Sequence, residues 1–291
     1  MTASAAKVAL VAVIIPCFDD GATVREAVES ALAGDGSVEV VVVDDGSSDP
    51  GTARVLREIA AEDVTVLRQE NVGVAAARMA GLRATTAPYV LPLDADDVLS
   101  PGAITRLVEA LRAAPDAAAA WGWYERMGAE DTLQPTAPTL DAWQVSHQND
   151  LPATALFRRA ALEAVGGWHP VAGFEDWDLW MSLAERGWTG VGLDIVVYRY
   201  RRADGRRLEQ DTDREAIVRA DLVARHPDLL AGRSRAWRRS RAPLPLRLAL
   251  PIVARLPVGI RHRRLLAGAA THLAHRRGVG LLMRRVRQQA R

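Results

Sequence analysis

The first hundred residues alternate between short runs of β-branched residues and segments with the apolar spacing of helices, and this alternation constrains the fold most strongly. Residues 8–15, 38–43, 64–67 and 89–93 are mostly apolar runs of strand length. Strands that alternate with helices form βαβ units around a sheet that is covered on both faces. The sequence therefore predicts an α/β fold with a mostly parallel central sheet flanked by helices.

Capping signals mark several of the expected helices. Thr23 and Glu26 have the spacing of a capping box, and Asp49–Pro50 and Ser100–Pro101 each place a cap before a proline at the first helical turn. Further along, three prolines predict a loop over residues 132–152. The remaining pattern predicts strands over 117–127, 155–158 and 191–200, and helices over 160–165 and 177–186.

Charge divides the chain into two parts, although the formal total is only +1. Residues 1–228 hold 21 basic and 36 acidic side chains, whereas residues 229–291 hold 16 arginines and no acidic residue. We therefore expect one α/β domain over residues 1–230 and an arginine-rich helical extension over 231–291. Within the domain, the regular alternation covers about 8–115, and a less regular half covers about 116–205.

The basic tail, residues 233–291, has three interpretations. It could pack as a helical cover on the acidic domain, or its apolar stretches with an arginine rim could rest on an anionic membrane surface. A nucleic-acid partner is least favoured, because the tail lacks the interleaved basic and aromatic residues of a known module. No apolar stretch reaches the roughly 20 residues of a membrane span, and no export signal is recognised. These features predict a cytoplasmic protein, peripheral on the inner membrane face if the tail is an anchor.

The single cysteine excludes a disulfide scaffold and a cysteine-rich zinc or iron–sulfur site. Cys17 stands where a strand turns into a loop, so we expect a buried thiol rather than a reactive one. For His147 and His169, a structural role is favoured over a catalytic one.

Acidic residues follow two of the expected strands and open one of the expected helices. They form the clusters Asp44–Asp45, Asp94–Asp97 and Glu175–Asp176. Each cluster could be only a turn former or a helix cap. Ligands of open α/β sheets, however, bind at the carboxyl ends of the strands, so three clusters at one edge favour a binding site. Two close carboxylates suit Mg²⁺ or Mn²⁺ that also holds a diphosphate, and a separate carboxylate could be a general base.

Five motifs make the interpretation more specific. They are VIIPCFDD (13–20), VVDDGSSD (42–49), ENVGVAAAR (70–78), LDADD (93–97) and EDWDLW (175–180). In this order the set, which spans about residues 8–200, resembles family 2 glycosyltransferases of the glycosyltransferase A fold. The resemblance implies an inverting transfer of one sugar from a UDP-, GDP- or dTDP-sugar to an acceptor hydroxyl, with Mn²⁺ or Mg²⁺ as cofactor. The acceptor would be a glycan, a lipid-linked sugar or a small molecule.

The resemblance also implies roles for the matched residues. Asp176 would be the catalytic base, with Glu175 and Trp177 positioning the acceptor. Asp96, together with Asp94, would bind the metal. The residues implied for binding of the nucleotide-sugar are Pro16, Phe18, Asp20, Asp44, Asp45, Gly73, Arg78, Asp94 and Ala95. At a helix N-terminus, Asp176 is expected to remain ionised near neutral pH. The aromatic residues Trp121, Trp123 and Trp177 are expected in the core, with stacking on a sugar ring as the alternative.

Three departures from the family pattern bear on this interpretation. Phe18-Asp19 stands where a Tyr-Asn pair is more usual, and Met79 replaces an Asn. The His that often completes the metal site after the last strand is absent, and Arg201 or Arg202 could hold the diphosphate there instead. A non-catalytic adaptor that kept the fold remains the alternative. A sugar nucleotidyltransferase and a dinucleotide oxidoreductase are disfavoured, because no glycine-rich phosphate loop follows the first strand.

Overall fold

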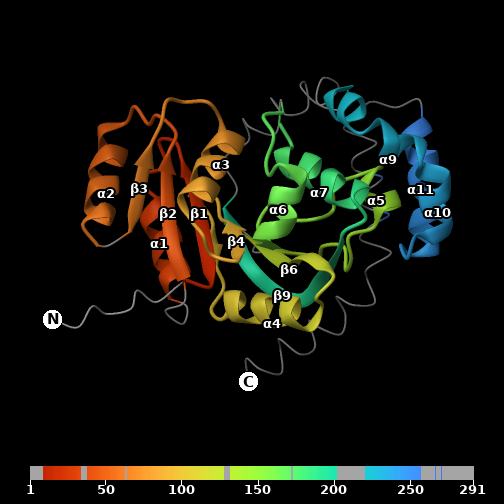
Figure 1. The fold of residues 1–291 in the computed structure, drawn as a ribbon, viewed down its shortest axis with the longest axis horizontal. Coiled ribbons are helices and arrows are strands. Elements are labelled where there is room, and N and C mark those ends of the chain that lie inside the picture. The colour runs from red at the N-terminus through yellow and green to blue at the C-terminus, as the bar shows by residue number, and fades with distance from the viewer. Residues whose placement is uncertain are drawn as a thin grey trace.

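The computed structural model describes residues 9–33, 38–62, 64–127, 132–171, 173–201 and 220–256, with the isolated positions 266 and 270. Within these ranges the chain forms a mixed nine-stranded sheet with helices on both faces (Figure 1). The strands are β1 (Val11–Cys17), β2 (Val38–Asp44), β3 (Thr65–Arg68), β4 (Tyr89–Pro92), β5 (Val98–Leu99), β6 (Ala117–Met127), β7 (Thr132–Gln134), β8 (Leu156–Arg158) and β9 (Thr189–Arg201). The helices are α1 (Val24–Leu32), α2 (Pro50–Ala60), α3 (Val74–Ala84), α4 (Ala103–Ala113), α5 (Ala142–Val145), α6 (Arg159–Val165), α7 (Glu175–Glu185), α9 (Pro227–Ala231), α10 (Arg233–Arg239) and α11 (Leu244–Arg255).

The strand order is β3-β2-β1-β4-β8-β6-β9-β5, with β7 paired to β6. Strand β1 is central and pairs in parallel with β2 and β4, so that Val13 lies opposite both Val40 and Leu91. Strands β6 and β9 are also parallel, whereas β8 runs antiparallel to both of its neighbours. The predicted α/β fold is confirmed, and every antiparallel pair includes at least one strand from the less regular half of the sequence.

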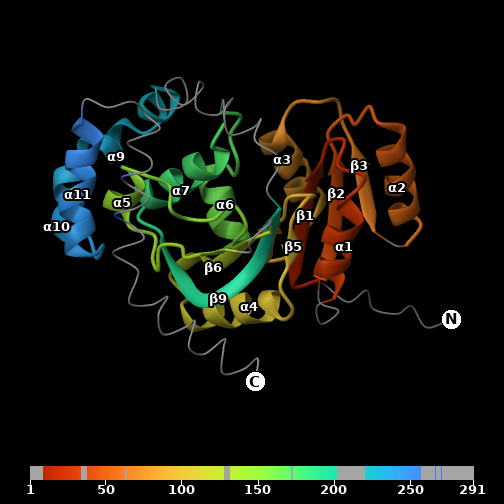
Figure 2. The same ribbon diagram turned by 180° about the vertical axis from the view of Figure 1, so that it is seen from behind.

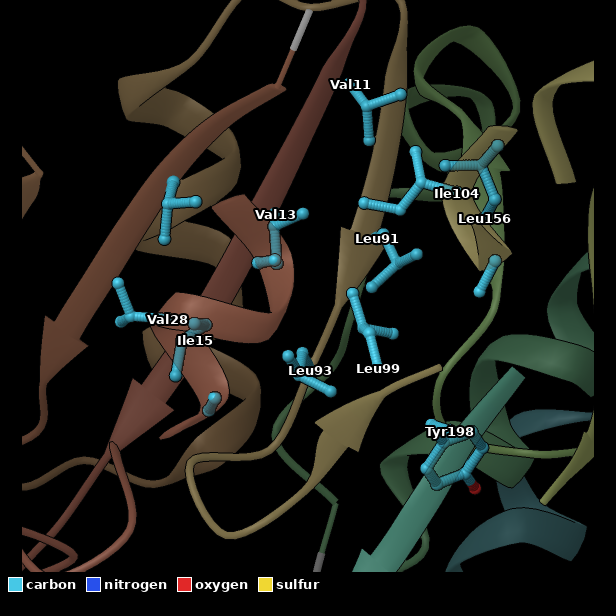
Figure 3. Close-up of a cluster of buried hydrophobic side chains, with 14 of the residues drawn as sticks. Val11, Val13, Ile15, Val28, Leu91, Leu93, Leu99, Ile104, Leu156 and Tyr198 are labelled. Carbon is cyan, nitrogen blue, oxygen red and sulfur yellow. The ribbon is translucent and has the colours of Figure 1, made fainter. Parts of the chain in front are cut away.

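The core fills both faces of this sheet because the strands carry apolar side chains in both directions. On one face, Val13 and Ile15 of β1 pack with Leu91 and with Val28 of α1 (Figure 3). On the other face, α3 lies so close to β1 that a Cβ on Gly81 would come within 2.4 Å of Ile14 Cγ2. Figure 2 shows α4 on one side of β6 and β9, with α6 and α7 on the other.

The local predictions had mixed outcomes. Asp49 caps α2 as expected, because its Oδ2 accepts a hydrogen bond from Thr52 N at 2.7 Å. The capping box at Thr23 was wrong: its hydroxyl donates to the carbonyl of Asp20 at 3.3 Å. Helix α4 begins at Ala103, later than the signal at Ser100–Pro101 indicated.

The predicted loop over 132–152 contains regular structure. Strand β7 pairs with β6, and α5 forms because Asp141 Oδ1 accepts a hydrogen bond from Gln144 N at 2.9 Å. The prolines therefore delimit short elements instead of excluding them. Trp121, considered for sugar stacking, belongs to the core. It is fully buried, its ring lies edge-on to that of Trp180 with centroids 5.2 Å apart, and its Nε1 donates a hydrogen bond to Ala137 O.

In the basic tail, α10 and α11 lie at the edge of the molecule beside α5 (Figure 1). Ala242, Leu246 and Leu250 are buried against Trp143 of α5. This packing places the described part of the tail on the domain, while the division of the chain at residue 230 stays a prediction. None of the helices in the described ranges is long and apolar enough to cross a membrane.

Candidate active site

The parallel strands bring three of the five motifs to one edge of the sheet. Strands β1 and β2 end in register, with Cys17 opposite Asp44, and the chain after β4 stays bonded to β1 through Leu93 N and Ile14 O at 3.0 Å. The loops that follow β1, β2 and β4 therefore lie side by side. Cys17 itself is buried, and burial raises the pKa of its thiol to about 12, so the thiol is unreactive as expected.

The loop after β1 presents an exposed aromatic side chain. Phe18 is 43% exposed, whereas Pro16 is buried within β1. Asp19 has a positive φ of 57° and accepts hydrogen bonds from Ser48 N and Asp49 N at 2.7 and 2.8 Å. These backbone bonds lower the pKa of Asp19. Of the residues predicted here, Phe18 can therefore offer a flat surface to a ligand, while Asp19 fixes the loop.

Asp44, the last residue of β2, and Asp45, which follows it, are buried and interact with nearby groups of the protein. Asp45 Oδ1 accepts hydrogen bonds from Gln69 Nε2 and Val72 N, and its Oδ2 accepts one from Gly73 N at 2.9 Å. Gly73 has a positive φ of 96°, and nothing lies within 4 Å of where its Cβ would be. Asp44 is held by an ion pair to Arg68. Together these acids shape the loop that exposes the backbone at the start of α3.

A buried arginine joins the two halves of the site. Arg78 is only 2% exposed, and its guanidinium donates to Asp94 Oδ1 and to Glu175 Oε1, both at 2.7 Å. Burial alone would lower the pKa of Arg78, but the two carboxylates outweigh burial and raise it above its ordinary value. Arg78 is therefore permanently charged, and it holds the acids of two distant motifs next to each other.

The carboxyl groups of the Asp94–Asp97 cluster differ in their exposure to solvent. Asp94 and Asp96 are partly exposed, whereas Ala95 and Asp97 are buried. Burial and then the charges of Asp94 and Asp96 raise the pKa of Asp97 to about 9, so Asp97 is protonated at neutral pH. Its Oδ1 accepts a hydrogen bond from Arg201 N at 3.1 Å, which ties the cluster to the end of β9.

This donor set fits a hard divalent cation. The described ranges hold no group of three His, Cys, Asp or Glu side chains placed to bind a metal. Asp94 and Asp96 nevertheless match the one or two carboxylates with which Mg²⁺ is usually held, because substrate phosphates and water complete its coordination. Any cation at this site would therefore depend on the phosphates of a ligand.

The last motif opens helix α7, which begins at Glu175, two residues earlier than predicted. Asp176 is half-buried in the first turn, and its Oδ2 accepts a hydrogen bond from Asn149 Nδ2 at 2.7 Å. Burial and then the charge of Glu175 raise the pKa of Asp176 to about 7. The expectation that the helix N-terminus keeps Asp176 ionised was therefore only partly right, because burial outweighs the dipole. A carboxylate with this pKa is well matched to a general base.

Comparison with known proteins agrees with this geometry. Residues 12–166, more than half of the chain, match the model of Glycosyl transferase family 2. The chain belongs to this family. The resemblance that five motifs suggested is thereby confirmed.

Curated relatives and solved structures match this family 2 chain over different lengths. An N-acetylglucosaminyltransferase of Bradyrhizobium elkanii is 36% identical over 116 residues, which are 38% of this chain and 63% of that protein. The next three curated relatives are covered over only 12% to 31% of their length. S. aureus TarS 1-349 in complex with UDP-GlcNAc has a TM-score of 0.58 at 16% identity, covering 91% of this chain and 72% of that one. The mannosyltransferase PcManGT of Pyrobaculum calidifontis, in complex with GDP-Man and Mn²⁺, has a TM-score of 0.56 at 20% identity, covering 94% and 87%. These two structures show the fold.

Arg201, one of the two arginines considered for the diphosphate, is the last residue of β9. Its Nε donates to the carbonyl of Asp96 at 3.1 Å, and its Nη2 donates to Glu26 Oε2 at 2.5 Å. The guanidinium therefore already has partners in this structure, although it remains 38% exposed. The other candidate, Arg202, lies outside the described residues.

Sequence reasoning missed a buried network that fixes α7 in this family 2 fold. Asp178 is fully buried, and its Oδ1 accepts hydrogen bonds from Arg225 Nε at 2.6 Å and His226 Nε2 at 3.0 Å. Its Oδ2 lies 2.8 Å from His169 Nδ1, in agreement with a structural role for that histidine. The network ties the helix that carries Glu175 and Asp176 to the segment before α9.

Two further contacts around α7 were also unforeseen. Trp177 is buried, and its Nε1 donates to Val145 O at 2.7 Å, which holds α7 against α5. Trp177 can thus influence an acceptor only through the elements that it fixes. Asn149, the partner of Asp176, lies in the segment predicted as a loop, where no motif distinguished it. His147 packs on Trp143 with ring centroids 4.6 Å apart, as expected of a structural residue.

Proposed function

We propose that this family 2 protein transfers a sugar from a nucleotide-diphospho-sugar to an acceptor hydroxyl, with inversion at the anomeric carbon. The observation that carries the proposal is the Arg78 bridge, because it places Asp94 of the donor motif beside the Glu175–Asp176 pair. A nucleotide-sugar bound along the strand ends would present its diphosphate to Asp94 and its sugar to Glu175 and Asp176. Base and leaving group would then lie on opposite sides of the sugar.

Asp176 is the general base in this mechanism. Its carboxylate accepts the proton of the acceptor hydroxyl while that oxygen bonds to the anomeric carbon, and the bond from this carbon to the diphosphate breaks. The hydrogen bond from Asn149 orients the carboxylate and favours its charged form, as does the nearby Arg78. Glu175, held by the same arginine, is placed to position the acceptor.

Asp94 and Asp96 would hold the divalent cation, Mn²⁺ or Mg²⁺. When bound, the cation supplies positive charge that stabilises the departing diphosphate. Asp97, buried and hydrogen-bonded to Arg201 N of β9, supports the loop that carries these two carboxylates. Arg201, at the same edge, can turn its exposed guanidinium to the diphosphate if it releases Glu26.

The donor is a UDP- or GDP-sugar, with a dTDP-sugar as the remaining option. Two observations support this choice: the structural neighbours hold UDP-GlcNAc and GDP-Man, and a curated relative is an N-acetylglucosaminyltransferase. The nucleotide would lie against Phe18 and the open backbone at Gly73, in the loop that Asp44 and Asp45 hold. The acceptor is a glycan, a lipid-linked sugar or a small molecule.

Calorimetric titration with UDP, GDP and dTDP tests the donor site. We expect one nucleotide to bind with micromolar affinity in Mn²⁺ and at least tenfold more weakly in EDTA. Asp96→Asn should remove the Mn²⁺ effect, whereas Glu163→Gln, on the exposed side of α6, should bind like the wild type. A folded protein that binds none of the three would overturn the proposal and favour an adaptor that kept only the fold.

A further inference from the structure

Helix α11 exposes an apolar stripe that the domain does not cover. Leu244, Leu248 and Ile252 are 58%, 56% and 62% exposed, far more than is usual for large aliphatic side chains. Their spacing of four residues places them on one face of the helix. The opposite face carries Leu246 and Leu250, which are buried against the domain. The stripe therefore faces away from the domain, because the opposite face of α11 is packed against it.

The surroundings of the stripe are basic. Arg255 is exposed at the end of α11, and Arg247 lies over the ring of Trp237 with its guanidinium 4.4 Å from the ring centroid. Trp237 of α10 is itself 38% exposed, and Arg238 beside it is exposed. No acidic residue occurs in residues 229–291, so no carboxylate of this segment offsets the charge.

A cavity of about 540 Å³ has Pro251 and Arg255, from the helix that carries the stripe, in its wall. Its walls come from α5, α10 and α11 and include Arg233, Arg255, Trp143 and Trp237. Two guanidinium groups among aromatic rings suit a phosphate attached to an organic group. Arg233 is anchored by a hydrogen bond to Ser146 Oγ at 3.1 Å, so its charge is fixed in place.

We propose that α10 and α11 form a docking surface for an anionic lipid bilayer. Leu244, Leu248 and Ile252 enter the boundary between headgroups and acyl chains, with Trp237 at headgroup level. The arginines bind lipid phosphates, each near the surface strengthening attachment roughly fivefold.

Other occupants fit the surface less well. A symmetric pairing of two copies would set the arginine-rich faces against each other, and like charges repel. A nucleic acid would neutralise the arginines but would leave the apolar stripe in water. Figures 1 and 2 show α10 and α11 at the end of the molecule opposite α2, so a bilayer there leaves the strand ends accessible. An acceptor carried by a lipid would then be held near the site.

Sedimentation of the full chain with vesicles tests this surface. The wild type should bind phosphatidylglycerol vesicles at least tenfold more tightly than phosphatidylcholine vesicles, and high salt should weaken the binding. The triple variant Leu244→Ser, Leu248→Ser and Ile252→Ser should bind roughly 1,000-fold more weakly, since each inserted side chain contributes roughly tenfold. The matched control is Leu32→Ser, which removes a 46% exposed leucine from α1 and should bind like the wild type.

A second variant tests the charges separately. Arg238→Gln with Arg255→Gln should lose roughly 30-fold in affinity for the anionic vesicles and nothing for the neutral ones. Near-UV circular dichroism and nucleotide titration of every variant establish that fold and donor site are intact, so this test is independent of the proposed transfer. The proposal is overturned if the wild type binds neither vesicle or both equally, or if the triple variant binds unchanged. It is also overturned if the stripe instead mediates dimers of the protein. The same holds if a nucleic acid displaces the vesicles and binds the wild type and the triple serine variant equally well.

Discussion

Replacing Asp178 with asparagine should lower the free energy of unfolding by about 3 kcal/mol. Removing one partner of a buried ion pair usually costs about 3–5 kcal/mol, because the other charge stays without compensation. Here Asp178 is fully buried, but its partners Arg225 and His169 are 32% and 29% exposed and can regain contact with water. Only His226, 3% exposed, is left in the interior. The cost therefore lies at the lower end of the usual range.

The pH dependence of this cost follows from two pKa shifts of opposite sign. Burial alone would raise the pKa of Asp178, but His226, Arg225 and His169 outweigh it and hold that pKa well below its ordinary value. Burial alone would lower the pKa of His226, but Asp178 and Glu185 raise it above its ordinary value. The stabilisation from Asp178 is complete above about pH 4 and is lost on acidification, and that from His226 is complete below about pH 6.5 and is lost as the pH rises. The difference between wild type and variant should be largest between these limits.

Urea unfolding followed by tryptophan fluorescence at pH 5.5 and pH 8.5 measures both effects. The matched control is Glu163→Gln, because Glu163 is 60% exposed and its contact with Arg159 is 3.8 Å long. Such a surface pair contributes about 0.5 kcal/mol or less. If Asp178→Asn destabilises the protein no more than the control, or if its cost grows from pH 5.5 to pH 8.5, the description of this network is wrong.

Three further predictions concern the site and its support. The rate of sugar transfer should rise with pH through about 7, because the base must be deprotonated and burial with the charge of Glu175 raises the pKa of Asp176 to about 7; a rate that is flat between pH 5.5 and 8.5 would argue against this base. Arg78→Met should lower the free energy of unfolding by about 3 kcal/mol and reduce turnover, since Asp94 and Glu175 lose their shared partner; Arg25→Met, on the exposed face of α1, is the control and should leave turnover unchanged. Gly81→Ala should cost about 1–3 kcal/mol in thermal unfolding, because the new Cβ meets Ile14 Cγ2 at 2.4 Å; an unchanged melting temperature would show that α3 can move away from β1.

The sequence predicted those features that local patterns encode. Strands β1 to β4 were found from their short apolar runs, which are β-branched in β1 and β2. The parallel pairing of β1, β2 and β4 then placed three motif loops at one edge. The motif residues Asp94, Glu175 and Asp176 were found because the five motifs follow one another in an order that resembles family 2 glycosyltransferases. None of this required knowledge of which side chains touch.

The rest depended on contacts between residues far apart in the chain. Arg78 was identified as a site residue, but its bridge to Glu175 joins positions 97 apart and has no local signal. Asn149 lies where no motif marks it. The partners of Asp178 come from two separate segments, one with His169 and one with Arg225 and His226. The raised pKa of Asp176 likewise reflects tertiary burial, which a helix N-terminus alone does not reveal.

The most direct test of the account compares wild type and Asp176→Asn in one experiment. Nucleoside diphosphate release from the preferred nucleotide-sugar measures the reaction, and calorimetry measures nucleotide affinity in the same preparations. Because a general base typically contributes about 10²–10⁴-fold, release should fall at least 100-fold while the Kd for the nucleotide changes less than about threefold. Full release by Asp176→Asn would contradict the assignment of the base, and with it the central claim that α7 carries the catalytic group.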